Sequence, residues 1–329
     1  MKTIKFNYFV AFALVVLLIA CEKEITYERG VNDLYLYSIT DDTTSQITDN
    51  TNIGGSFSFS PDSKKIYYLD HKNIYSINLD GTGKTSISIP SLMHFDLSSD
   101  GKKIAYNDEK FRLFLINSDG ANKQLLVDSR EIYSLKWSPD GEKILCFLSN
   151  NELGIVTLDG NIKTITSNFN SFIPEEVWSS DAKKIVFSKY DSNKIEQIYI
   201  YNLINDSVIQ ITHSLKPCSQ AIWNPIKNEI VYSIQSKKDV SDLMIMNSDG
   251  TEQKTLIKQG SFLSLHWAKD GTQISFMVSD SIKHEFNFAI IDKNGNDFRI
   301  INKIHYDCSE HLWSPDSKYI IYHRILFTY

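Results

Sequence analysis

Glycine, proline and cysteine are scarce in this chain of 329 residues, which contains 14, 7 and 4 of them. So few glycines and prolines exclude a collagen-like or low-complexity polymer. A chain of this length can bury a sizeable core without disulfide bonds, as one large all-β domain or as two smaller domains.

An excess of positive charge is also missing, because the formal net charge is −6. Two of the 34 basic residues, Lys2 and Lys5, lie in an apparent leader, which leaves 32 basic against 40 acidic residues in the remainder. A predominantly negative protein repels phosphate backbones, which argues against nucleic acid as a partner.

The one long apolar run is Phe9 to Ala20, twelve residues that follow the positive start. This run is too short to cross about 30 Å of hydrocarbon as a helix, which requires about 20 residues. The pattern therefore indicates an export signal. No later segment is apolar for long enough to be a membrane span.

The run ends in Leu18-Ile19-Ala20-Cys21, which resembles the lipobox of bacterial lipoproteins. The resemblance implies cleavage before Cys21, lipid on its thiol and acylation of the new amino terminus, with a signal peptide at 1–20 and a tether at 21–33. Two or more acyl chains would anchor the protein stably. The alternative is an ordinary secretory signal with a chance cysteine.

By resemblance to sorting rules, the absence of Asp after Cys21 favours the outer membrane over inner-membrane retention. Glu22-Lys23-Glu24 faintly resembles a surface-export signal. The periplasmic side and the cell surface both stay open as places for the domain.

Seven copies of one motif recur, each beginning at an aromatic or leucine anchor. Five copies begin with tryptophan, as in Trp137-Ser-Pro-Asp-Gly, and two degenerate copies precede them. The anchors are spaced 38, 40, 41, 45, 44 and 46 residues apart: Phe59, Leu97, Trp137, Trp178, Trp223, Trp267 and Trp313.

Each copy predicts four strands. Ser-Pro-Asp-Gly makes a tight turn, because proline fixes φ, aspartate bonds nearby backbone and glycine accepts a positive φ. An alternating second strand follows, as at 143–147, then a third strand, an Asp-Gly turn and a short fourth strand. Four strands in about 40–45 residues are typical of a propeller blade.

The two ends of the chain complement each other. Residues 34–48 look like the third and fourth strands of a blade that lacks its first two, and Trp313 is followed only by a second strand through Tyr322. Pairing these halves predicts an all-β, seven-bladed propeller over 34–329, in which the amino-terminal strands complete the last blade and cover open sheet edges.

These repeats resemble the TolB-type, WD-like propeller family, whose signature is Trp-Ser-Pro-Asp-Gly followed by Lys-Lys-Ile-Ala. Lys102-Lys103-Ile104-Ala105 is a close copy. We expect no counterpart of TolB's separate amino-terminal domain, and seven blades instead of TolB's six. The Trp223 copy has lost Asp-Gly, so its turn is expected to differ.

Motifs that carry chemistry are missing. There is no G-x-S-x-G nucleophile elbow, P-loop or dinucleotide fingerprint, and His284-Glu285 lacks the second histidine of a zincin. The repeated Asp is expected to form turns, not to bind calcium, and the tryptophans to pack between blades. We therefore expect no enzyme, cofactor or metal.

Three residues before each anchor lies a position that is polar and varies between repeats: Ser56, His94, Ser134, Glu175, Gln220, Ser264 and Glu310. Glu176, His266 and His311 lie nearby. In a propeller these positions meet at one end of the central channel. Such a mouth could bind a cation, a sugar or a basic peptide end, or it could hold only water.

The cysteines beyond Cys21 are expected to be apolar filler. Cys146 falls in a second strand, and Cys218 and Cys308 lie five residues before their tryptophans, in blades that are not adjacent. A disulfide stays open as an alternative.

Two functions of different class follow. The first is a non-enzymatic, monomeric outer-membrane lipoprotein whose propeller is a scaffold for an envelope protein or another ligand. The alternative is a glycan-binding or lyase-like propeller with a metal or histidine site at the mouth. That site would be formed by residues among His94, Glu175, Gln220, His266, Glu310 and His311.

Overall fold

A computed structural model describes residues 31–49, 51–71, 73–89, 91–167, 169, 173–280, 285–304 and 310–326. Its regular elements are all β-strands, and within these ranges no helix is long and apolar enough to cross a membrane. The leader, Cys21, residues 22–30 of the tether and Cys308 lie outside the described residues.

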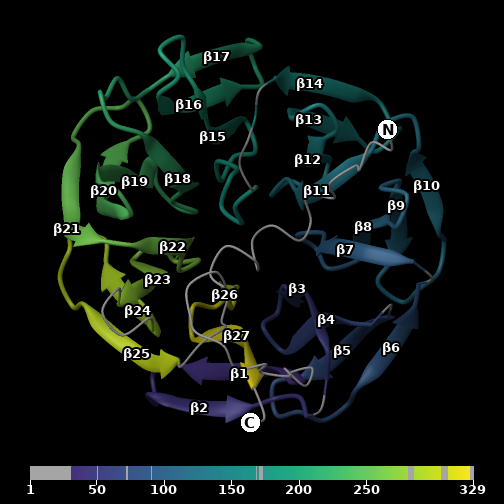
Figure 1. Cartoon of the computed structure of the whole chain (residues 1–329). Coiled ribbons are helices and arrows are strands. Elements are labelled where there is room, and N and C mark those ends of the chain that lie inside the picture. The colour runs from purple at the N-terminus through teal and green to yellow at the C-terminus, as the bar shows by residue number, and fades with distance from the viewer. Residues whose placement is uncertain are drawn as a thin grey trace, which may run out of the picture. The chain divides into compact units, whose positions relative to one another are not determined.

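The strands form seven sheets around one axis, which confirms the predicted seven-bladed propeller (Figure 1). Blades 1 to 3 each run from the innermost to the outermost strand in chain order. The strands of blade 1 are β3 Ile53–Phe59, β4 Lys65–Asp70, β5 Asn73–Asn78 and β6 Thr85–Ser88. Those of blade 2 are β7 Leu92–Leu97, β8 Lys103–Asp108, β9 Leu113–Asn117 and β10 Gln124–Val127. Those of blade 3 are β11 Ile132–Trp137, β12 Lys143–Leu148, β13 Glu152–Thr157 and β14 Ile162–Thr166.

In the part of the chain that the structure describes, blade 4 has three regular strands, and its innermost segment pairs with the next strand through a bridge between Trp178 and Ile185. Blades 5 and 6 again have four strands. The strands of blade 4 are β15 Lys184–Tyr190, β16 Glu196–Asn202 and β17 Ser207–Gln210. Those of blade 5 are β18 Cys218–Trp223, β19 Glu229–Lys237, β20 Val240–Asn247 and β21 Lys254–Gly260. Those of blade 6 are β22 Phe262–Trp267, β23 Gln273–Asp280, β24 Glu285–Asp292 and β25 Arg299–Ile304.

Blade 7 is assembled from both ends of the chain in the order β2-β1-β27-β26, as predicted. Its strands are β1 Val31–Ser38, β2 Thr43–Gln46, β26 His311–Trp313 and β27 Tyr319–Leu326. Next to the β1–β27 pair, Ile39 N donates to Lys318 O at 2.9 Å. The first strand begins at Val31, three residues earlier than the predicted start at Leu34.

The repeated turn forms as its residues predict. In blade 1, Ser60 Oγ donates to Asp62 Oδ1 at 2.7 Å, and Lys64 N donates to the same oxygen at 3.2 Å. In blade 5 the contacts differ, because Asn224 Oδ1 accepts from the backbone N–H groups of Ile226 and Lys227 at 2.9 and 3.0 Å. The side-chain amide takes over the turn-capping role of the missing aspartate.

The five tryptophans are core residues, each exposed by 5% or less. Trp137 of blade 3 packs in one cluster with Leu113 and Leu115 of blade 2, which shows the predicted packing between blades. Cys146 and Cys218 are fully buried free thiols. They act as small apolar side chains, and burial raises the pKa of the Cys218 thiol to about 11.

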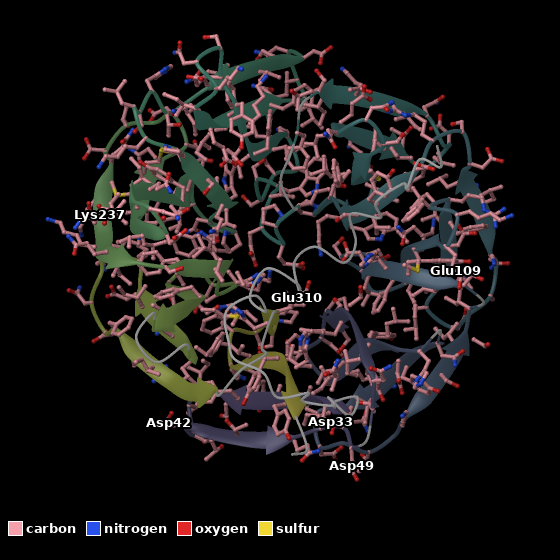
Figure 2. The ribbon with its side chains drawn as sticks, viewed as in Figure 1. Asp33, Asp42, Asp49, Glu109, Lys237 and Glu310 are labelled. Atoms are coloured by element: carbon pink, nitrogen blue, oxygen red, sulfur yellow. The ribbon has the colours of Figure 1, made fainter. Side chains whose placement is uncertain are left out.

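A buried carboxylate fastens the closing blade to blade 1. Asp33 on β1 is 2% exposed, and its Oδ1 accepts from Thr48 Oγ1 at 3.0 Å, Thr51 N at 3.1 Å and Thr51 Oγ1 at 2.8 Å. Figure 2 labels Asp33 beside the strands of blade 7. These bonds join the start of β1 to the chain that enters blade 1.

We expect Asp33→Ala to lower the free energy of unfolding by about 2–4 kcal/mol, because it leaves the buried N–H of Thr51 without its acceptor and removes the hydrogen bonds from the hydroxyl groups of Thr48 and Thr51. Chemical denaturation measures the change. Asp119→Ala is the matched control, since Asp119 accepts only an exposed turn N–H, and it should cost less than about 1 kcal/mol. Equal losses in both variants would contradict the role of Asp33.

Candidate functional site

The seven polar positions three residues before the anchors all lie on the innermost segments of the blades, around the propeller axis (Figure 1). Each of the seven side chains is half-buried. Figure 2 shows Glu310 near the centre of the ring of blades. These residues form what we call the axial ring: Ser56, His94, Ser134, Glu175, Gln220, Ser264 and Glu310.

Backbone irregularities fall at the axial ring. The pairing register between the innermost and second strands shifts at this place in blades 1, 2, 3, 5 and 6. Gln220 and Ser264 have positive φ values of 54° and 51°. A bulge leaves a residue out of the ladder and turns its side chain. The bulges therefore give the ring positions a direction that plain strand alternation would not.

Lys136 connects three blades beside the axial ring. Its ammonium group lies 3.0 Å from Asp96 Oδ1 of blade 2 and also forms an ion pair with Glu175 of blade 4. The second oxygen of Asp96 accepts from Trp137 N at 2.7 Å. All three ionic side chains are largely buried, so the pairing offsets their loss of hydration.

Glu176 of blade 4 makes a second set of contacts, with blade 6. Its carboxylate lies 2.7 Å from Lys269 Nζ and 3.2 Å from His266 Nδ1, both in blade 6. Burial opposes ionisation, but Lys269 and His266 outweigh it and lower the pKa of Glu176 to about 2. Together with the first set, these residues make up the axial ion-pair cluster: Asp96, Lys136, Glu175, Glu176, His266 and Lys269.

Glu310 of blade 7 differs from the other carboxylates of the site. Burial raises its pKa to about 7, the negative charge of Glu175 adds to the shift, and Lys136 opposes it. Near neutral pH this side chain is therefore part protonated, and it can exchange a proton with solvent or with a ligand.

His94 and Gln220 also lie in the axial ring, held by contacts with the neighbouring blades. Ser56 Oγ lies 3.4 Å from His94 Nδ1, and burial lowers the pKa of His94. Gln220 Nε2 donates to Phe262 O at 2.9 Å. His94 is therefore largely neutral at pH 7, which suits hydrogen bonding better than charge pairing.

His311 lies behind the ring, contrary to the expectation that it lines the mouth. It is fully buried, its Nε2 lies 2.7 Å from Ser275 Oγ, and its ring packs edge-on against His266 with centroids 4.6 Å apart. Burial holds the pKa of His311 well below its usual range. A side chain so enclosed cannot meet a ligand without moving, whereas His266 belongs to the cluster and contacts Glu176.

The sequence analysis missed Asp96, Lys136 and Lys269. Asp96 and Lys136 occupy the position just before the anchor in consecutive repeats, where opposite charges face each other across one blade boundary. Lys269 stands where four of the other turns carry proline: Pro61, Pro139, Pro225 and Pro315. In each case the sequence does offer a signal, because a charged side chain stands at a position where most other repeats have an uncharged one.

Within the described ranges, no three His, Cys, Asp or Glu side chains form a group that could hold a metal ion. The charged residues of the site are instead paired with one another. Chemically, the arrangement offers fixed charges, neutral imidazole and one carboxyl group that titrates near neutrality.

Comparison with known proteins identifies the repeats. A family model described as the TolB β-propeller domain matches residues 106–326. A curated relative, dipeptidyl-peptidase 5 of Porphyromonas endodontalis, is 27% identical over 127 residues, which cover 32% of this chain and 18% of that protein. The chain thus matches less than a fifth of that relative's length.

Solved structures share the fold. An oligogalacturonate lyase of Vibrio parahaemolyticus is 13% identical with a TM-score of 0.67, over 90% of this chain and 98% of that one. The tricorn protease is 10% identical with a TM-score of 0.66, over 89% and 36%. An Agrobacterium tumefaciens protein assigned as a TolB is 14% identical with a TM-score of 0.59, over 91% and 99%. Identities this low show a common fold alone.

Proposed function

The chain belongs to the TolB β-propeller family, and we propose that it is a non-enzymatic binding scaffold of the cell envelope, anchored to the outer membrane by lipid on Cys21. The axial ion-pair cluster is the observation that carries this proposal. Its charged side chains come from blades 2, 3, 4 and 6, and ion pairs among them hold them in place. They lie beside the half-buried polar side chains of the axial ring. Fixed groups suit recognition, because little side-chain entropy is lost when a partner binds.

Capture from detergent-solubilised envelopes tests the scaffold function. The full chain is used as bait beside Glu175→Gln, Lys269→Gln and the control Lys102→Met, whose side chain is 82% exposed in a turn and makes no contact with the cluster residues that the structure describes. We expect a specific partner with the wild type and the control, and at least a tenfold loss with the cluster variants. Equal recovery by all four proteins, or no specific partner at all, would overturn the proposal.

Cys21→Ser is expected to release the protein from the membrane, because the lipobox cysteine supplies the thiol that carries the lipid. Fractionation should move most of the protein from the membrane pellet to the soluble fraction, and incorporation of labelled palmitate should fall to background. Cys146→Ser serves as the control, since that thiol is buried in blade 3. Retention of the Cys21→Ser protein in the membrane would show that another segment anchors it.

A second candidate, a lyase-like activity on acidic polysaccharide, is favoured by Glu310. A carboxyl group that titrates near pH 7 is suited to general acid–base catalysis, and the fold is shared with an oligogalacturonate lyase. Incubation with oligogalacturonate, followed by ultraviolet absorbance of unsaturated products, tests this candidate. Activity in the wild type that is lost in Glu310→Gln would favour it over the scaffold, whereas no product would remove it.

A further inference from the structure

Three half-buried aromatic rings follow one another across blades 2 and 3, near the axial ring. Phe111 and Tyr133 have ring centroids 4.8 Å apart, and Tyr133 and Phe147 have centroids 5.7 Å apart. We call Phe111, Tyr133 and Phe147 the rim aromatic ladder. Tyr133 comes directly before Ser134 of the axial ring, so the ladder adjoins the candidate site.

The backbone at Phe111 is unfavourable for its side chain. Phe111 has a φ of 58°, in the left-handed region that costs a bulky residue about 1 kcal/mol or more. The same turn recurs in blade 4, where Lys194 N donates to Asp191 O as Phe111 N does to Asp108 O, and Lys194 has a φ of 61°. Phenylalanine at this place therefore needs a reason beyond turn formation.

Tyr133 is turned by a bulge and held by a carboxylate. The register passes from Ile132↔Leu148 to Ser134↔Phe147, which leaves Tyr133 outside the ladder of paired residues. Its hydroxyl donates to Glu131 Oε2 at 2.7 Å, and this bond together with burial raises the pKa of Tyr133 to about 12. The ring thus has a set position beside an exposed carboxylate.

Charged groups flank the same edge of the ladder. Arg130 forms an ion pair with Glu152 at 2.7 Å and donates to Ser149 O at 3.0 Å. Glu131 is exposed, and its charge is not matched by Arg130, which is engaged with Glu152. The surroundings combine aromatic rings with hydrogen-bond acceptors.

We propose that the rim aromatic ladder is a stacking platform for a neutral glycan. Each sugar ring would pack on the face of one aromatic ring, because neighbouring rings of the ladder are inclined to one another by 73° and 59°. Partly exposed aromatic rings pack against the C–H faces of pyranoses, and carboxylates such as Glu131 accept hydrogen bonds from sugar hydroxyl groups. Arg130 is engaged with Glu152, and the carboxylate of Glu131 would repel a uronate, which favours a neutral chain. The inference rests on the proposed binding function and names the class of one ligand.

Affinity electrophoresis of the full chain in detergent tests the platform, in gels containing amylopectin, mannan, hydroxyethyl cellulose or polygalacturonate. We expect at least one neutral polysaccharide to retard the wild type, and Tyr133→Ala and Phe111→Gly to lose at least tenfold in affinity. Tyr190→Ala is the matched control, since Tyr190 is 50% exposed elsewhere, and it should be retarded like the wild type.

Phe111→Gly separates a binding role from a packing role. Glycine relieves the positive φ, which offsets the loss of ring packing and the entropy cost of glycine, so the melting temperature of the variant should stay close to that of the wild type while binding is lost. Retardation by polygalacturonate alone, no retardation in any gel, or full binding by both ladder variants would overturn the inference. The scaffold function is judged separately, because envelope capture depends on Glu175 and Lys269 and not on the ladder.

Discussion

Lys136→Met is expected to lower the free energy of unfolding by about 3–5 kcal/mol, the cost of leaving buried carboxylates without their cation. The carboxylates of Asp96 and Glu175 lie in blades on either side of Lys136, so both lose their partner at once. Chemical denaturation at pH 7 measures the loss. The effect should be largest there and shrink in acid, where the two carboxylates take up protons.

Lys102→Met is the matched control for that substitution. Lys102 pairs with Asp100 at 3.5 Å, but its side chain is 82% exposed and solvent screens the pair. Such surface pairs contribute about 0–1 kcal/mol. If Lys136→Met cost no more than this control, the axial ion-pair cluster would not be a stabilising element, and its fixed geometry could not support the binding proposal.

Glu310→Gln is expected to stabilise the protein above neutral pH. Because the folded-state pKa of about 7 exceeds the ordinary value of 4.5, the native state holds the proton more tightly than the unfolded chain does. Wild-type stability therefore falls as pH rises from about 4.5 to about 7, and the loss persists above that range. Glutamine does not ionise, so the stability of the variant does not fall in this pH range for this reason.

The expected difference is about 1–3 kcal/mol in favour of Glu310→Gln at pH 8, and close to zero at pH 4, after allowance for the partial exposure of Glu310. Thermal unfolding across this pH range measures it. Glu142→Gln, at a side chain 74% exposed in a turn, should follow the wild type throughout. A constant offset between Glu310→Gln and the wild type at every pH would show that packing, not ionisation, is responsible.

The rim aromatic ladder and the axial ion-pair cluster illustrate two ways in which a repeat can depart from the shared pattern. At Phe111 a residue that suits neither the turn nor its φ remains in the fold. At Asp96, Lys136 and Lys269 charged side chains replace residues that other repeats use for packing or turns. Local departures of this kind are expected at functional sites, because recognition requires groups that folding alone does not.

The sequence by itself determined the repeat, the number of blades and the closure of blade 7. Those features depend on local patterns: alternating strands, turn residues such as Asp62, and an anchor such as Trp137 that must be buried. Each repeat carries the same pattern of strand and turn residues, so seven copies predict seven blades. The capping of the blade 5 turn by Asn224 also follows from short-range chemistry.

Only the tertiary structure decided which polar groups meet. Lys136 and Glu175 are 39 residues apart and Glu176 and Lys269 are 93 apart, so their contacts exist only once the blades close around the axis. Bulges then decide which way the side chains beside the axial ring turn, and packing encloses His311 behind His266. Strand alternation cannot encode these outcomes, because a one-residue shift in register reverses the direction of a side chain.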